Sequence, residues 1–215
     1  MKLTLRQKAY RSIKNKIIYF DLKPGERILE SQIARTLKLG RMPVREALAM
    51  LENERLIVRS DGYGYKVKKL RDAEIKDYFE IRASLEKIGA ALLVDRATDA
   101  DIAKMKKHIE KAVGIYQRND LYKIIESDTK FHDLMYLSTK SEVFFETISS
   151  LSDKTIIMRA AALQTQSGRE MSISDHVKIM AAIENRNLKT LLELIQEHLK
   201  FAPRHYESIR PFIFL

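Results

Sequence analysis

The sequence contains no cysteine and no tryptophan, and only 4 of its 215 residues are proline. The lack of cysteine excludes disulfide bonds and thiolate ligands, so any metal site must use nitrogen and oxygen donors. No apolar run approaches the ~20 residues that span a bilayer, and charged residues interrupt residues 1–20 too often for a signal peptide. These absences favour a reducing, cytoplasmic setting and exclude a membrane partner.

The basic residues are concentrated in one part of the chain. Residues 1–70 hold 17 Lys and Arg against 7 Asp and Glu, which accounts for the whole net charge of +10. Residues 71–215 balance 22 basic against 22 acidic residues. Solubility would not require this segregation, whereas a polyanionic partner would. We therefore expect a DNA-binding domain over residues 1–70 and a second domain over residues 71–215.

Hydrophobic periodicity predicts three helices in the first domain. They cover residues 4–20, residues 29–39 and the segment from Pro43 onward, and Gly40 ends the second helix with a tight turn. Alternating runs around Asp61-Gly62 then predict a β-hairpin. Two short helices joined by a glycine turn and followed by a hairpin make a winged helix-turn-helix.

Arginines stand at the start of the third helix, where a recognition helix meets base edges in the major groove. Arg41 and Arg45 are about one turn apart and share an exposed face. They are therefore candidates for contact with guanine or with phosphates, and the plain alternative is a solvated charged face. Arg59 and Lys66 would give the hairpin, or wing, a phosphate-facing edge.

The segment LKPGERILESQIARTLKLGRMPVREALAMLENERLIVRSDGYGYKV resembles the DNA-binding domain of the GntR family of bacterial transcription regulators. The resemblance implies DNA contact at the start of the recognition helix and at the wing tip. The expected DNA-binding residues are Arg41, Met42, Arg45, Arg59, Gly62, Tyr63, Gly64 and Lys66. Met42 stands where the family usually has a Ser or Thr that would cap the helix, and losing such a cap costs about 1 kcal/mol.

The sequence of the second domain predicts helices throughout, because no segment shows the alternating pattern of a strand. We expect an all-α bundle of six helices, near residues 72–96, 99–118, 120–138, 141–165, 173–186 and 188–206. Thr98 with Asp101, and Ser172 with Asp175, have the spacing of a capping box. The chain as a whole is thus predicted to be mostly α, a winged helix-turn-helix followed by a helical bundle.

Polar residues occupy inward positions on three of these helices. Asp128 and His132 share one face of 120–138, His176 lies on the apolar stripe of 173–186, and His198 lies on that of 188–206. An unpaired buried carboxylate is costly, and a shared divalent cation would satisfy all four groups because imidazole and carboxylate suit zinc and related metals. Each residue could instead be a hydrogen-bonded core residue. His108 and His205 lie off these stripes and are left out of the site.

Four segments of the second domain, YFEIRASLEKIGAALLVDRAT, DTKFHDLMY, DHVKIMAAIENRN and LIQEHLKF, resemble the FCD-type ligand-binding domain of the FadR branch of the same family, in its six-helix, VanR-like form. The resemblance implies a metal held by Asp128, His132, His176 and His198. Zinc is the first expectation, with nickel, manganese or iron as alternatives. It also implies a small organic acid, a carboxylate, as effector.

Arg82 continues the inward stripe of the helix near 72–96. A buried guanidinium could hold the effector carboxylate bidentately, and the alternative is an ion pair inside the bundle.

These features together predict a ligand-responsive transcription regulator, not an enzyme, that binds operator DNA on the nucleoid as a homodimer, since a two-fold protein reads a palindromic site. Two alternatives remain. One is a metalloenzyme that acts on a small acid, because such a metal could activate water. The other is a DNA-binding protein with a purely structural metal.

Overall fold

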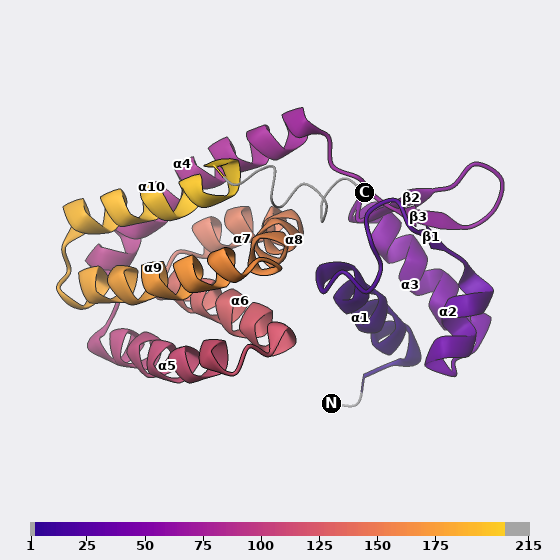
Figure 1. Ribbon diagram of the computed structural model, residues 1–215, viewed down its shortest axis with the longest axis horizontal. Helices are drawn as coiled ribbons and strands as arrows, with labels where there is room; N and C mark the ends of the chain where they lie inside the picture. Colours follow the sequence, from indigo (N-terminus) through magenta and orange to yellow (C-terminus); the bar gives the residue numbers. More distant parts are fainter. Residues whose placement is uncertain (1–2, 205–215) are drawn as a thin grey trace. The chain divides into compact units, whose positions relative to one another are not determined.

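A computed structural model describes residues 3–204. His205, which was predicted to lie outside the metal site, and the end of the helix predicted over 188–206 are not among the described residues. Within them, a first compact unit ends at Arg71 and a second begins at Asp72 (Figure 1). No helix in the described part of the chain is long and apolar enough to cross a membrane.

The first unit is a winged helix-turn-helix, as predicted. Its elements are α1 (Leu5–Ile18), β1 (Arg27–Ile28), α2 (Glu30–Leu37), α3 (Arg41–Asn53), β2 (Ile57–Arg59) and β3 (Tyr65–Val67). β2 and β3 form the predicted hairpin, in which Val58 pairs with Lys66. The sequence did not predict β1, a two-residue strand that pairs with the other side of β3. The sheet therefore has three antiparallel strands in the order β1-β3-β2.

The start of α3 differs from the prediction. The helix begins at Arg41, and Gly40 is its N-cap residue, so Met42 lies inside the first turn and does not take the place of a capping residue. Glycine is only a few tenths of a kcal/mol worse than the best caps, so the expected loss of about 1 kcal/mol at Met42 is wrong. The turn before α3 is made by Lys38, which has a φ of 53°, and not by Gly40.

The second unit is an all-α bundle, as predicted, but its described residues form seven helices and not six. They are α4 (Asp72–Arg96), α5 (Asp99–Gln117), α6 (Leu121–Ser138), α7 (Glu142–Ser150), α8 (Ser152–Leu163), α9 (Gln166–Glu184) and α10 (Leu188–Arg204). The span 141–165 is broken at Leu151, which ends α7 and precedes α8. The resemblance implied a six-helix form, and the structure corrects this to seven helices among the described residues.

The two predicted capping boxes have different outcomes. The Thr98 hydroxyl accepts from the backbone N–H of Asp101, whose side chain accepts in return, so this box is confirmed. Ser172 lies in the middle of α9, because that helix begins at Gln166 with Thr165 as its cap. The predicted gap between the helices near 141–165 and 173–186 is therefore wrong over residues 166–172, which belong to α9.

The bundle core is built from α4, α5, α6, α9 and α10. Its fully buried side chains include Leu93, Met105, Phe131, Ile179 and Leu191. In Figure 1, α10 lies alongside α4, and α9 lies alongside α10. This packing turns one face of α6, α9 and α10 toward a common interior.

Gly168 lets α9 begin directly against the end of α8. A Cβ atom at this position would lie 1.9 Å from the carbonyl oxygen of Ala162. We predict that Gly168→Ala lowers the free energy of unfolding by about 1–3 kcal/mol, the usual cost of overpacking, measured by urea denaturation. Gly114→Ala is the matched control, because its Cβ would meet only the flexible end of Arg118 at 3.8 Å. The control should be neutral or stabilising, and equal effects at the two glycines would contradict this account.

Candidate metal centre and nucleic-acid interface

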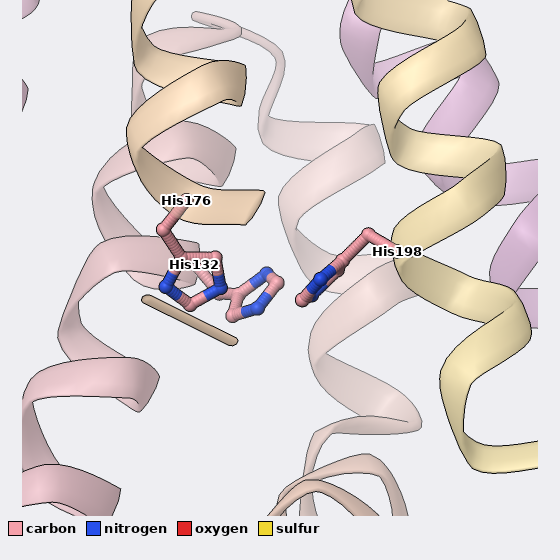
Figure 2. A group of neighbouring side chains, drawn as sticks. All are labelled: His132, His176 and His198. Atoms are coloured by element: carbon pink, nitrogen blue, oxygen red, sulfur yellow. The ribbon is translucent and has the colours of Figure 1, made fainter. Parts of the chain in front are cut away.

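Three of the four predicted metal ligands come together in the bundle interior. His132 on α6, His176 on α9 and His198 on α10 each offer one ring nitrogen, and these nitrogens lie within 4.8 Å of one another. The ring centroids are 5.0–5.8 Å apart. Figure 2 shows the three rings converging from three helices. This is the spacing expected of side chains that share one small ligand.

Several ring nitrogens of the histidine cluster have no hydrogen-bond partner within the described part of the chain. Both ring nitrogens of His132 and Nε2 of His176 are buried and have no hydrogen-bond partner. Burial lowers the pKa of both rings, and the neighbouring guanidinium of Arg159 lowers it further. Both imidazoles are therefore neutral near pH 7, the form in which histidine binds a metal ion.

Asp128, the fourth predicted ligand, lies beside the three rings but is turned partly away. Its Oδ1 is 3.7 Å from Nε2 of His176 and accepts a hydrogen bond of 3.2 Å from Ser172. Its Oδ2 lies 3.2 Å from Nε of Arg159 in an ion pair that does not have hydrogen-bond geometry. The Ser172 hydroxyl is in turn bonded to Tyr116 at 3.1 Å.

His198 has an outer partner of its own. Its Nδ1 lies 3.2 Å from Oδ2 of Asp175, so a hydrogen bond there leaves Nε2 as its free nitrogen. Carboxylates that accept from the second nitrogen of a metal-binding histidine fix its tautomer and orientation. His108, predicted to lie outside the site, is bonded instead to the backbone oxygen of Ser127 at 2.9 Å.

Arg82 is buried, as expected from its stripe, and it forms an ion pair. Its Nε donates to Glu86 over 3.1 Å, and Glu86 also accepts a hydrogen bond of 2.5 Å from Tyr136. Arg82 thus forms an ion pair inside the bundle, with Glu86, which was the alternative to a contact between Arg82 and the effector. Glu86 is only 3% exposed, and its Oε1 lies 3.8 Å from Nδ1 of His132.

Sequence reasoning missed Glu86, Arg159 and Asp175 around the centre. Glu86 is four residues after Arg82 on one helix face, a spacing that predicts an ion pair. Arg159 is the one charged residue in the run TIIMRAAAL, and a lone charge in an apolar helical segment was the signal that could have found it. Arg82 and Arg159 both line a pocket that also touches Asp128 and His198.

The predicted DNA-reading residues of α3 lie on the surface of the first unit. Arg41 and Arg45 are exposed, and the side chain of Met42 is 61% exposed. Arg45 is not free: its Nε and Nη2 bond to the carboxylate of Glu30 on α2 at 3.0 and 3.2 Å. This bidentate pair orients the guanidinium at the start of α3, and sequence reasoning did not foresee it.

The wing carries the remaining predicted residues. Gly62 and Gly64 have positive φ values of 96° and 88°, which glycine adopts without strain. Tyr63 between them is 62% exposed, and its backbone oxygen accepts from Arg27. Two further predicted residues lie on the strands, where Arg59 pairs with Glu52 at 3.2 Å and Lys66 is half-buried.

Comparison with known proteins matches both units to one family. The second unit matches the FCD domain over residues 77–201, and the first matches the bacterial regulatory proteins of the gntR family over residues 5–67. The chain belongs to the FCD-containing GntR family of transcription regulators. The relatives are regulators, so the family gives no support to the metalloenzyme alternative.

Similar proteins cover nearly the whole chain. It is 23% identical to the uncharacterized HTH-type transcriptional regulator YdhC of Bacillus subtilis, over 93% of this chain and 90% of that one. It is 26% identical to the Nta operon transcriptional regulator of Aminobacter aminovorans, over 89% and 88%. The solved structure of McbR/YncC of E. coli has a TM-score of 0.80 at 20% identity, with 98% and 99% covered, which shows a shared fold.

The three-histidine cluster predicts binding of a divalent cation. Replacing His132, His176 or His198 singly by Ala should weaken Zn²⁺ or Co²⁺ binding by more than about a hundredfold, because even outer partners of ligands are worth ~10–100-fold. The measurement is a competition titration with a chromophoric chelator. His108→Ala is the control and should keep wild-type affinity. Equal affinity in all four variants would rule out the shared site.

Proposed function

We propose that this protein is an effector-responsive regulator that binds operator DNA as a homodimer and holds a divalent metal in its second unit. Residues 1–70 form the DNA-binding domain in this proposal, and residues 71–215 form the metal- and effector-binding domain. Family membership supports a regulator of transcription. The observation that carries the finer proposal is the buried cluster of three converging histidines.

The exposed arginines support DNA binding through α3 and the wing. Arg41 and Arg45 lie in the first two turns of the second helix of a helix-turn-helix, the part that contacts base edges. Glu30 holds Arg45 in a fixed orientation, which reduces the entropy lost when the guanidinium meets a base or a phosphate. Lys66 and the exposed tip around Tyr63 would contact the backbone or the minor groove.

The outer face of α4 supports a homodimer. Ile81 and Ile88, two turns apart on this helix, are 49% and 54% exposed, whereas Arg82 and Glu86 are buried. Val143 at the start of α7, a helix that packs against α4, is 76% exposed. Exposed apolar side chains on one helix face, such as these two isoleucines, are candidates for a contact surface, and a two-fold dimer buries the same face of both copies.

The buried nitrogens support the metal. His132, His176 and His198 would hold it, and Asp128 would join them from beside His176. When bound, the metal would act as a Lewis acid toward an oxygen atom of the effector. The side chains of the protein have two further roles in this proposal. Asp175 orients His198, and the pocket lined by Arg82 and Arg159 binds the effector. Zinc suits this donor set, and nickel, manganese and iron are alternatives.

The recognition role of Arg45 can be tested with the operator. Arg45→Ala should weaken specific DNA binding by about 1–3 kcal/mol if the guanidinium reads a base, measured by fluorescence anisotropy at fixed salt. Lys104→Ala removes an exposed cation from α5 and serves as the control. An Arg45→Ala protein that binds the operator as tightly as the control would exclude this contact.

A further inference from the structure

Two hydroxyl groups form a hydrogen-bonded chain that ends on Asp128. Ser172 on α9 is buried, and its hydroxyl oxygen lies 3.2 Å from Oδ1 of Asp128. The hydroxyl oxygen of Tyr116, on α5, lies 3.1 Å from that of Ser172. Three helices therefore contribute to this chain, and its last member is the carboxylate that stands beside the histidine cluster.

The chemistry of the three groups fixes the direction of the chain. A carboxylate only accepts hydrogen bonds, so Ser172 donates its single hydroxyl hydrogen to Asp128. Tyr116 must then donate to the Ser172 oxygen, and burial raises the pKa of Tyr116, which keeps its hydroxyl protonated. Hydrogen bonds that follow one another in this way polarise and strengthen each other. Tyr116 thereby strengthens the hydrogen bond that Ser172 gives to Asp128.

The Asp128 carboxylate is held from two opposite sides. Ser172 holds Oδ1, which is the oxygen that lies 3.7 Å from Nε2 of His176. Arg159 attracts Oδ2, whose distance of 3.2 Å to Nε belongs to an ion pair without hydrogen-bond geometry. Among the described side chains, Ser172 is thus the one that fixes this carboxylate by a hydrogen bond. Without this bond, the ion pair would draw the carboxylate toward Arg159.

The spacing along the helices places Ser172 for this task. Ser172 and His176 are four residues apart on α9, and Asp128 and His132 are four residues apart on α6. Residues at this spacing lie on the same face of a helix. Ser172 therefore holds Asp128 from the face of α9 that also carries a ring of the cluster, and Oδ1 stays beside that ring.

The donor types at the proposed site make the choice of metal depend on Asp128. The three histidines offer only nitrogen atoms, and Asp128 is the one carboxylate assigned to the site. Imidazole suits zinc, whereas carboxylate oxygens suit harder ions such as Mn²⁺. A carboxylate that is held beside the rings therefore adds more to the binding of Mn²⁺ than to that of Zn²⁺.

We infer that Ser172, ordered by Tyr116, positions the Asp128 carboxylate as a metal ligand and so helps to set which divalent metal the histidine cluster prefers. The inference rests on the proposed function, because it uses the metal site formed by the three histidines and Asp128. It adds two positioning residues and a preference among metals to that site.

The affinities of the full chain for two metals test this inference, with Zn²⁺ measured by chelator competition and Mn²⁺ by the electron paramagnetic resonance signal of the free ion. Ser172→Ala should weaken Mn²⁺ binding by about tenfold or more, the usual cost of losing an outer partner of a ligand, and Zn²⁺ binding by a smaller factor. Tyr116→Phe should shift the ratio of the two affinities in the same direction but less, because Ser172 still donates to Asp128.

Ser138→Ala is the matched control. It removes another buried serine hydroxyl, which donates to the backbone oxygen of Leu134 and not to a residue of the cluster. Both metal affinities should stay at the wild-type values. A double-mutant cycle separates positioning from a general structural role: in an Asp128→Asn background, Ser172→Ala should cost no further affinity, because the hydroxyl acts through the carboxylate.

The inference is overturned if Ser172→Ala keeps the wild-type ratio of Mn²⁺ to Zn²⁺ affinity, if it costs as much in the Asp128→Asn background, or if the wild type binds no Mn²⁺. A wild type that binds no Zn²⁺ overturns the proposed metal site as well, whereas retained Zn²⁺ binding confines the failure to this inference. Should Ser172→Ala lose its helical circular dichroism, the affinity ratio of Tyr116→Phe decides.

Discussion

Desolvation of polar groups is the constraint on which the second unit depends. Three helices bring imidazole rings into the interior of a bundle whose hydrophobic core is built of leucine, isoleucine, methionine, phenylalanine and alanine. Burying a polar group without a hydrogen bond typically costs ~1–3 kcal/mol in a protein, and His132 alone buries two such nitrogens. The divalent cation that we propose would offset this cost for all three rings at once.

The charged groups around the rings follow the same logic. Glu86 compensates Arg82, Asp128 faces Arg159, and Asp175 accepts from His198. Because Asp128 lies between Arg159 and His176, a cation bound at the proposed site would change the partner that Asp128 offers to Arg159. An effector changes DNA affinity only if it favours one arrangement of the two units over another. An effector in the pocket proposed here would contact α8, α9 and α10, and these contacts could favour one arrangement.

Hydrophobic periodicity was sufficient to predict much of this structure. The histidines were found because each replaced an apolar residue on a helical stripe, and a stripe has a defined face. The break at Leu151 was missed because neither Gly nor Pro marks it. The start of α9 was placed at residue 173 and not at Gln166, because the close approach of Gly168 to Ala162, with which the helix begins, depends on tertiary packing. Partners such as Arg159 and Glu30 depend on tertiary packing, which no single stretch of sequence encodes.

The central claim is that three imidazoles of this chain hold one metal ion, and X-ray absorption at the metal edge tests it most directly. The protein is purified without chelator, loaded with one equivalent of Zn²⁺ and separated from free metal. The account predicts three nitrogen neighbours at about 2.0–2.1 Å, with the outer-shell scattering of imidazole rings. A metal surrounded only by oxygen, or a protein that retains none, would contradict it.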